Sequence, residues 1–347
     1  MARVRQRGEA VRNFIISHVD ASPADIARVT SEKFAISRQA ANKHLRNLVA
    51  GGFLAESGNT KNRSYKLQPL LEYWNWYDIG QGLQEDRVWR EDIAPILGAM
   101  PENVTDIWHY AFTEMFNNAI DHSAGTLITV YVEKTAATTE MRIFDDGVGI
   151  FRKIGQRFGL EDERHAVLEL AKGKLTTDPA RHTGEGIFFT SRVVDVFDIL
   201  SGGVFLAHRF GDAEDWILER DAPKEGTAVM MKLANHTSRA LKKVFDQFTS
   251  DDGDYGFNKT VVPVRLALYG DDKLVSRSQA KRLLVRFERF KMVILDFAGI
   301  DFIGQAFADE VFRVFSLAHP EVELVAINTS KDAKKMISRA RTGAASQ

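Results

Sequence analysis

Apolar residues near the N-terminus recur every three to four positions, which is the spacing of helices that bury one side. This pattern predicts three helices: one that ends near Asp20, a short one after Ser22-Pro23, and one over 38–50. Gly51-Gly52 ends the third helix, and two short alternating runs around Gly58-Asn59 then predict a two-stranded hairpin. The first 68 residues are therefore expected to form three helices followed by a hairpin.

The middle region mixes helical and strand-like patterns. Helical spacing resumes at Val104 and continues to Ala119, and another helix is expected to begin at the glycines of 184–186. Alternating or continuous apolar runs predict strands at 126–134, 140–144, 196–201, 204–209, 216–219 and 227–233. The middle of the chain is therefore expected to contain both helices and strands.

From residue 255 onward, strand and helix patterns alternate, which is typical of a small α/β layer. The expected strands cover 261–268, 291–297 and 322–327, and the expected helices cover 276–290, 304–317 and 331–339. A chain of 347 residues is also too long for one compact core. The sequence thus predicts a multi-domain α+β protein with domains at 1–68, 88–235 and 255–347.

An aromatic segment separates the first two domains. Tyr73, Trp74, Trp76 and Tyr77 cluster within residues 69–87. Aromatic side chains at this density could stack on nucleic-acid bases, but they more often pack against neighbouring protein. We therefore interpret 69–87 as a linker that packs against the domain that follows it.

The formal net charge of −1 hides an uneven distribution. Residues 1–68 hold 12 Lys and Arg against 5 Asp and Glu, a net charge of +7, and the rest of the chain carries −8. A basic domain of this kind favours a polyanion such as DNA as its partner.

Composition also excludes several function classes. The chain has no cysteine, which rules out disulfides, thiolate zinc sites and cysteine nucleophiles and fits a cytoplasmic protein. No apolar run reaches the length of about 18–20 residues that a membrane span requires. We expect a soluble protein without a membrane partner.

Three short motifs in the middle region carry candidate chemistry, and the first lies on the predicted helix that follows Val104. Glu114 and Asn118 are four residues apart there, so both side chains project from one face. A carboxylate can orient or deprotonate a water, and a carboxamide oxygen is a suitable ligand for Mg²⁺. The pair suits a magnesium-nucleotide site.

The other two motifs are rich in glycine. Asp145 leaves a strand and enters the turn Gly147-Val148-Gly149, where a carboxylate can accept a hydrogen bond from an exocyclic amine and the glycines allow close approach of a ligand. Gly184-Glu185-Gly186 begins a helix, whose first N–H groups can hold phosphate oxygens.

In this order and at these spacings, the three motifs resemble those of the GHKL superfamily of ATP-binding domains. That superfamily includes type II topoisomerases, mismatch-repair ATPases, histidine kinases and anti-sigma-factor kinases. The resemblance spans about residues 88–234 and implies a two-layer α/β sandwich of helices on a mixed sheet, which holds ATP and Mg²⁺ under a mobile lid. It implies that Asn118 ligates magnesium, that Glu114 activates the attacking water, and that Asp145 binds the adenine amino group.

The same resemblance assigns the glycines and one threonine. Gly147 and Gly149 would shape the adenine pocket, and Gly184 and Gly186 would contact phosphates. Thr227, after Gly226, would help to fix the adenine, although a strand-start residue without a ligand is the alternative.

The lid would comprise residues 151–183. Its cations are candidates to meet the γ-phosphate, among them Lys172, Lys174, Arg181 and His182.

The chain departs from the sensor histidine kinases of this superfamily in two ways. The dimerising hairpin with a phosphoacceptor histidine is missing upstream, and we expect His109 to be a packed or surface histidine. Glu114 is also typical of the ATPase branches, which favours hydrolysis or the anti-sigma-like branch. A slow ATPase is therefore favoured over a protein kinase.

The three N-terminal helices and the hairpin resemble a winged helix-turn-helix, in which the third helix enters the DNA major groove and the wing touches the backbone. The resemblance covers residues 1–68 and implies that Lys61 and Arg63 of the wing meet phosphates. The residues that would face the groove are Arg38, Gln39, Asn42, Lys43 and Arg46. A winged domain used only for protein contacts is the alternative.

Residues Asp296 to Glu310 resemble the core loop and helix of STAS domains, the anti-anti-sigma fold, and more closely a STAS-like domain of unknown function found behind GHKL domains. The resemblance covers about 255–339. In anti-anti-sigma proteins a serine at the start of this helix is phosphorylated. Here Gly304-Gln305 occupies that position, and no serine or threonine occurs from Asp301 to Arg313. We therefore expect docking of a protein partner or intramolecular regulation in place of phosphorylation.

Together these features predict an ATP-binding, slowly hydrolysing regulator whose nucleotide state controls its contacts with DNA or a partner. Two alternatives stay open: an anti-sigma-type serine kinase in a partner-switching module, and an ATP-gated dimeric DNA clamp. The sequence also leaves open whether the protein forms a homodimer.

Overall fold

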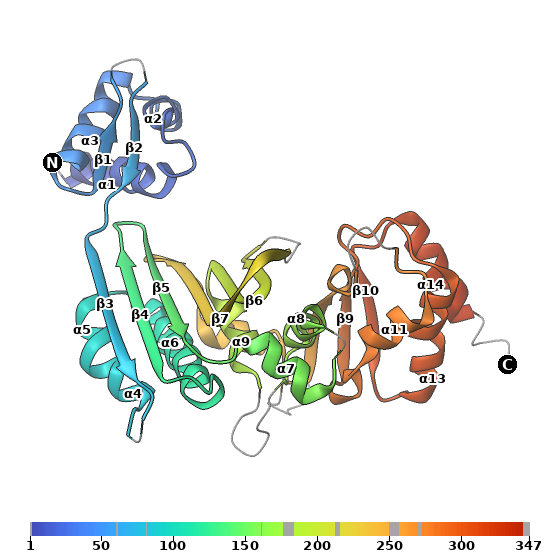
Figure 1. Ribbon diagram of the computed structural model, residues 1–347. Coiled ribbons are helices and arrows are strands. Elements are labelled where there is room, and N and C mark those ends of the chain that lie inside the picture. The colour runs from blue at the N-terminus through green and yellow to red at the C-terminus, as the bar shows by residue number, and fades with distance from the viewer. Residues whose placement is uncertain are drawn as a thin grey trace.

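The computed structural model describes residues 2–59, 62–80, 82–160, 162–175, 184–211, 216–249, 257–268 and 273–342. These residues form a mixed α/β structure with a two-stranded, a five-stranded and a three-stranded sheet. Figure 1 shows three parts in chain order, which we call the N-terminal unit (2–67), the sheet unit (71–246) and the C-terminal unit (257–342). None of the described helices is both long enough and apolar enough to cross a membrane.

The N-terminal unit contains the predicted three helices and hairpin. Its elements are α1 (Ala2–His18), α2 (Ile26–Phe34), α3 (Arg38–Ala50), β1 (Leu54–Ser57) and β2 (Ser64–Leu67). The Ser37 hydroxyl accepts a hydrogen bond from the Ala40 amide and so caps α3, as expected for serine at this position. The three helices and the hairpin share one hydrophobic core, which includes Ile15, Ile26 and Leu45. This core is separate from the core of the other two units.

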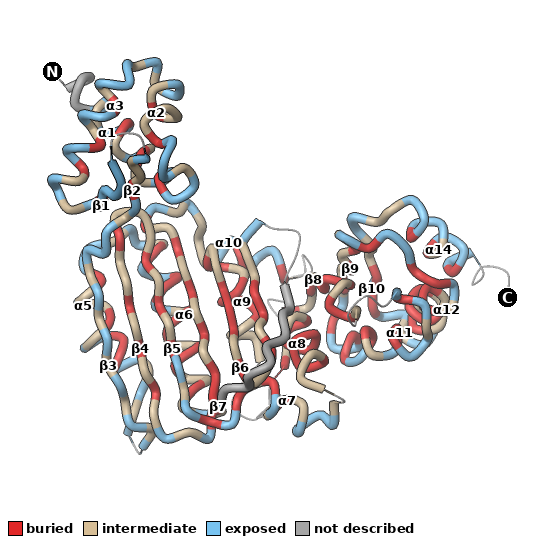
Figure 2. The backbone as a smooth tube through the Cα atoms, turned by 45° about the horizontal axis from the view of Figure 1, so that its top comes forward, coloured by how far each residue is buried: buried red, intermediate tan, exposed pale blue. Residues whose placement is uncertain are grey.

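The sheet unit is built on five strands in the order β3-β4-β5-β7-β6. All pairs among these described strands are antiparallel, so the expected mixed sheet is wrong. They are β3 (Leu71–Asp78), β4 (Leu127–Lys134), β5 (Thr138–Asp145), β6 (Val196–Arg209) and β7 (Trp216–Ala234). The other elements of the unit are α4 (Glu85–Val88), a π-helical turn (Trp89–Ile93), α5 (Ala94–Leu97), α6 (Glu102–His122), α7 (Ile150–Phe158), α8 (Glu163–Lys172), α9 (Gly186–Val193) and α10 (Leu241–Asp246). Helix α6 packs against β4, β5 and α9, and its Trp108, Phe112 and Phe116 are fully buried. Figure 2 shows that buried positions also recur along β4 and β5.

The segment expected to be a linker contains the edge strand β3. It pairs with β4 over its whole length, from Leu71 opposite Lys134 to Asp78 opposite Leu127. The aromatic cluster concealed the strand because aromatic residues occupy both of its faces. Tyr77 is half-buried and its hydroxyl donates to Asp92 at 2.9 Å, whereas Trp74 and Trp76 are 69% and 64% exposed. The expected packing against the neighbouring domain thus takes the form of strand pairing.

The C-terminal unit has a parallel sheet in the order β10-β9-β8. Its strands are β8 (Lys259–Pro263), β9 (Met292–Asp296) and β10 (Glu323–Ile327). Its helices are α11 (Arg277–Leu284), α12 (Gln305–Asp309), which continues through a π-helical turn (Glu310–Phe315) into α13 (Ser316–Ala318), and α14 (Lys331–Thr342). Strands alternate with helices here as the sequence predicts.

Two predicted elements of this unit are shorter in the structure. The strand expected to reach residue 268 ends at Pro263, which cannot donate a ladder hydrogen bond, and a 3₁₀ turn follows at Val264–Ala267. The helix expected to reach residue 290 ends at Leu284. Its continuation is interrupted because Arg286 has a left-handed backbone, with φ of 65°.

A continuous hydrophobic core joins the sheet unit to the C-terminal unit. Phe188 of α9 lies against Phe257, with ring centroids 4.6 Å apart, and Phe257 lies 5.5 Å from Phe290. Burial of large aromatic side chains contributes strongly to packing. The two units therefore stabilise each other, while the N-terminal unit has its own core.

Candidate functional site

A pocket of about 250 Å³ lies between helices α6, α7, α8 and α9, the end of β5 and residues 227–229 within β7. Six of the eight residues predicted to bind the nucleotide line this pocket: Glu114, Asn118, Asp145, Gly184, Gly186 and Thr227. Gly147 and Gly149 do not line it but form the turn between β5 and α7. The structure thus brings together residues that come from separate elements of the chain.

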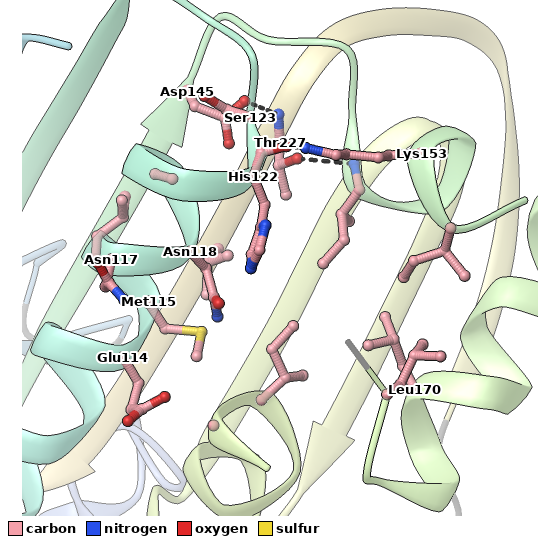
Figure 3. Close-up of a pocket in the computed structure, with 18 of the residues that line it drawn as sticks. Glu114, Met115, Asn117, Asn118, His122, Ser123, Asp145, Lys153, Leu170 and Thr227 are labelled. Atoms are coloured by element: carbon pink, nitrogen blue, oxygen red, sulfur yellow. Dashed lines mark hydrogen bonds between the residues drawn. The ribbon is translucent and has the colours of Figure 1, made fainter. Parts of the chain in front are cut away.

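Helix α6 supplies one wall of the pocket. Glu114, Asn118 and His122 follow one another at every fourth position, so they lie on the same side of the helix. Figure 3 shows these side chains along the pocket, with Met115 beside them. The opposite side of α6 carries Phe112 and Phe116 into the core, which fixes how the helix faces the pocket.

Asp145 is the last residue of β5 and pairs with a residue inside β7. The pairing places Asp145 directly opposite Thr227. Its Oδ1 accepts hydrogen bonds from the amides of Gly147 at 3.0 Å and Thr227 at 3.3 Å. Asp145 also lines the pocket, and a carboxylate has lone pairs enough to accept a further hydrogen bond from a ligand there.

Burial controls the electrostatics of Asp145. Removal from water raises the pKa of the Asp145 carboxyl above its ordinary value, and hydrogen bonds from Gly147 and Thr227 oppose this rise. The Thr227 side chain is 9% exposed, and its hydroxyl accepts a hydrogen bond from the Ile150 amide at 3.1 Å. Thr227 thereby ties the start of α7 to the floor of the pocket.

The neighbouring Asp146 is turned away from the pocket. Its Oδ1 accepts from the amides of Thr126 and Leu127 at 2.7 and 2.9 Å, and its Oδ2 accepts from the Thr126 hydroxyl at 2.7 Å. These bonds lower the pKa of Asp146. The two adjacent carboxylates therefore differ in their roles: Asp146 holds the turn, and Asp145 faces the pocket.

Three glycines of these motifs lie in close contact with neighbouring atoms. Gly149 has φ of 87°, a left-handed conformation that favours glycine, and a Cβ there would lie 2.7 Å from Ser201 Oγ. A Cβ on Gly147 would lie 2.1 Å from the Ser123 carbonyl oxygen. At the first residue of α9, a Cβ on Gly186 would lie 1.9 Å from Glu114 Oε2. The backbone at the start of α9 is therefore open to the pocket and beside the Glu114 carboxylate.

Several pocket residues were not predicted from the sequence, and Lys153 is the most informative of them. Its Nζ donates to the His122 carbonyl at 2.6 Å, and burial lowers its pKa. His122 could have been found as the next residue of the stripe that starts at Glu114. No sequence pattern marks Lys153, because only the packing of α7 beside the end of α6 brings it to the pocket.

The expected roles of the lid cations in phosphate binding are partly wrong. Lys172 is completely buried, and its Nζ bonds to Glu169 and to the Val285 carbonyl of the C-terminal unit. Lys174 Nζ donates to the Arg289 carbonyl at 3.0 Å. Both ammonium groups donate hydrogen bonds to backbone carbonyls of the C-terminal unit, which places them at the interface between the two units. Arg181 and His182 lie outside the described residues.

The basic residues of the N-terminal unit form a separate candidate surface. The five residues expected to face a DNA groove are all exposed: Arg38, Gln39, Asn42, Lys43 and Arg46. They lie on α3 away from Leu45 and Leu48, which are buried. In the wing, Lys61 lies outside the described residues, and Arg63 forms an ion pair with Glu56 at 3.1 Å.

Comparison with known proteins adds one finding. A family model described as a STAS-like domain of unknown function matches residues 279–334. The match begins within α11 and ends within α14, so it lies entirely in the C-terminal unit. The predicted STAS-like region is thus confirmed over these residues. No curated protein matches the chain.

Proposed function

We propose that the pocket binds ATP with Mg²⁺ and that the protein is a nucleotide-responsive regulator that binds DNA. The convergence of Glu114, Asn118, Asp145 and Thr227 on one pocket carries this proposal, because these residues come from three different elements. Each has the chemistry expected for one part of a magnesium nucleotide.

The donor set of the pocket fits such a ligand. The Asp145 carboxylate would accept the adenine amino group. The Asn118 amide oxygen would ligate Mg²⁺, which is commonly held by one or two protein oxygens together with phosphates. The backbone at Gly184 and Gly186 would receive the phosphates at the start of α9, an eight-residue helix. The pocket volume of about 250 Å³ lies just below the usual range of about 300–1,000 Å³ for small-molecule sites.

The Glu114 carboxylate supports slow hydrolysis in addition to binding. It lies beside the backbone of Gly186, where the terminal phosphate would be held. There Glu114 would orient a water and accept its proton, a role that typically contributes 10²–10⁴-fold to a rate. ATP would supply the reactive phosphoryl group when bound.

We assign the sheet unit to the GHKL-type two-layer ATP-binding domains. Support comes from the antiparallel five-stranded sheet with α6 and α9 packed against it, and from the position of the motifs at the pocket. We assign the N-terminal unit to the winged helix-turn-helix domains, with DNA as its partner. Its helix order, hairpin and exposed basic side of α3 support this assignment.

The proposal predicts that nucleotide state changes DNA affinity. Coupling free energies between sites are typically about 1–3 kcal/mol, equivalent to about 5–150-fold in affinity. The test compares DNA affinity in the apo state, with ADP and with non-hydrolysable ATP at one fixed salt concentration. Salt must be fixed because phosphate contacts alone change affinity by about 10³–10⁵ between 50 and 200 mM. Equal affinity in all three states would refute the regulatory part of the proposal.

A further inference from the structure

A cluster of charged residues is buried where the sheet unit meets the C-terminal unit. It comprises Glu169 and Lys172 of α8 and Arg286, which follows α11. The side chains of Glu169, Lys172 and Arg286 are 5%, 0% and 7% exposed. Figure 1 shows α8 between the five-stranded sheet and β9 of the C-terminal unit. The cluster therefore belongs to the interface between the units and does not face solvent.

The two cations make reciprocal contacts across this interface. Lys172 of the sheet unit donates to the Val285 carbonyl at 3.0 Å and to the Arg282 carbonyl at 3.4 Å, at the end of α11. Arg286 of the C-terminal unit donates to the carbonyls of Gly173, at 3.2 Å, and Lys174, at the end of α8. Each helix thus has its C-terminal end, which favours positive charge, bound by a cation from the other unit.

Glu169 joins the two cations. Its Oε1 accepts from Lys172 Nζ, and its Oε2 accepts from Arg286 Nη1 at 3.1 Å. A second tie comes from β8, where the Thr260 hydroxyl donates to the Lys172 carbonyl at 2.7 Å. Buried charges are costly unless they are paired and hydrogen-bonded. Each of these three charged groups has such partners, although Arg286 Nε has none among the described residues.

The backbone on both sides of the contact is strained. Arg286 has φ of 65° and Lys174 has φ of 52°, which are left-handed values that side-chain-bearing residues rarely adopt. Such conformations persist only where surrounding contacts impose them, and they cluster at functional sites. Here the imposing contacts are those between Arg286 and the two carbonyls after α8.

The same segment of chain forms a wall of the pocket. Leu170 and Leu175, on either side of Lys172, line the pocket. The Leu175 amide donates to the Gly184 carbonyl at 3.1 Å, and a Cβ on Gly184 would lie 2.4 Å from the Leu175 carbonyl carbon. Movement of residues 173–175 would therefore move Gly184, which is proposed to contact phosphates.

We infer that the C-terminal unit regulates the nucleotide pocket, and that Arg286 is the positioning residue through which it acts. This inference rests on the proposed function and adds its regulation. Arg286 donates hydrogen bonds to the carbonyls of Gly173 and Lys174 and so fixes the backbone that leads into Leu175. The Leu175 amide in turn donates to the Gly184 carbonyl. A partner that moves α11 away from α8 would break these hydrogen bonds and free residues 173–175 to move. The C-terminal unit thus acts as a regulatory domain of the nucleotide pocket.

The test uses the full-length protein and three arginine variants. Arg286→Ala removes the contacts. Arg286→Lys keeps the charge, but a single ammonium group cannot contact Glu169 and both carbonyls as the guanidinium does. Arg339→Ala is the control. Arg339 is an exposed residue of α14. Glu169→Gln, which keeps the shape of the side chain, provides an independent break of the same cluster.

The first readout is amide hydrogen exchange without nucleotide. We expect faster exchange at residues 170–175 and 184–193 in Arg286→Ala and Glu169→Gln, a smaller change in Arg286→Lys, and no change in β4 and β5, which report on the fold as a whole. Arg339→Ala should match the wild type. Wild-type exchange at 184–193 in both Arg286→Ala and Glu169→Gln would overturn the inference, and this readout does not depend on ATP.

The second readout is ATP affinity in the presence of Mg²⁺, measured by calorimetry. We expect Arg286→Ala to bind about 5–150-fold more weakly, the range of typical coupling between sites. Because coupling is reciprocal, ATP with Mg²⁺ should slow exchange at residues 277–286 of the wild type, an effect that a purely structural residue would not produce. Unchanged affinity in Arg286→Ala would also overturn the inference. If the wild type binds no ATP, the proposed function fails, and the exchange data still decide whether Arg286 positions the pocket wall.

Discussion

The backbone of Gly186 lies so close to the Glu114 carboxylate that a methyl group would not fit between them. A Cβ built on Gly186 would come within 1.9 Å of Glu114 Oε2. The start of α9 and the centre of α6 are thus in contact at the point where a terminal phosphate and a hydrolytic carboxylate would meet in the proposed site. This contact provides the sharpest substitution test of the pocket.

Gly186→Ala is expected to displace either the start of α9 or the Glu114 side chain. Overpacking of this kind typically costs about 1–3 kcal/mol of stability. We expect ATP binding to weaken by at least tenfold, as measured by calorimetry, while far-UV circular dichroism stays unchanged. Gly155→Ala is the matched control, because a Cβ at that position of α7 meets nothing within 4 Å. If Gly186→Ala binds ATP as tightly as Gly155→Ala, the phosphates are not held at the start of α9.

Glu114→Gln separates binding from hydrolysis. Glutamine has the same shape but cannot accept a proton from water, so the rate of phosphate release should fall about 10²–10⁴-fold. ATP affinity should stay within about threefold of the wild type. Glu102→Gln, in the first turn of the same helix and exposed, is the control. Single-turnover release of phosphate measures the effect, and a normal rate in Glu114→Gln would remove this residue from the mechanism.

Asp145→Asn should stabilise the apo protein at neutral pH. Burial raises the pKa of Asp145 above its ordinary value of 3.8, so at a pH between these two values the folded protein binds more protons than the unfolded chain. Stability is therefore lost as the pH rises from about 3.8 through the raised pKa, and the full cost is present above it. Asparagine keeps an oxygen for the amides of Gly147 and Thr227 but carries no charge.

The expected result is a higher Tm for Asp145→Asn than for the wild type at pH 7, with a difference that shrinks as the pH falls toward 4. Asp106→Asn, an exposed substitution on α6, should show no such trend. ATP affinity should fall in Asp145→Asn, because an acceptor for the adenine amino group is lost. A lower Tm at pH 7, or a difference independent of pH, would contradict the assignment of Asp145 as a partly buried carboxylate that faces the pocket.

The exposed side of α3 makes a prediction about salt dependence. Replacing Arg38, Lys43 or Arg46 by alanine should weaken DNA binding, and each lost phosphate contact should reduce the slope of log affinity against log salt by about 1. A residue that reads a base should instead relax preference at one position of the site, at a cost of about 1–3 kcal/mol. Lys33→Ala, an exposed lysine at the end of α2, is the control. Fluorescence anisotropy at several salt concentrations measures both effects, and equal slopes for all variants would exclude α3 from the interface.

The sequence was a good guide to the elements whose periodicity is simple. Helix α3 has the predicted bounds, because Ser37 caps it and Gly51 ends it. Strand β3 was missed because Trp74 and Trp76 are apolar but exposed, so the alternation of apolar and polar residues that marks a strand is absent. The break after Leu284 was missed because it is imposed by tertiary contacts of Arg286, which no local pattern records.

The same distinction applies to the pocket. Glu114, Asn118 and Asp145 could be predicted because their motifs have a fixed spacing along the chain. The environment of Lys172 could not be predicted from the sequence. Its partners, Glu169 and the carbonyl of Val285 after α11, come together only when the two units pack. A lysine in a predicted lid is expected to be exposed, but Lys172 is completely buried.

Calorimetric titration of the protein with ATP, with and without Mg²⁺, tests the central claim most directly. The account predicts binding of one ATP per chain that is strengthened by Mg²⁺, and loss of the Mg²⁺-dependent part in Asn118→Ala, since Asn118 is the proposed metal ligand that lines the pocket. The apo variant should keep the wild-type Tm within a few degrees. Absence of binding at millimolar ATP and Mg²⁺, or the same Mg²⁺-dependent affinity in Asn118→Ala, would contradict the account.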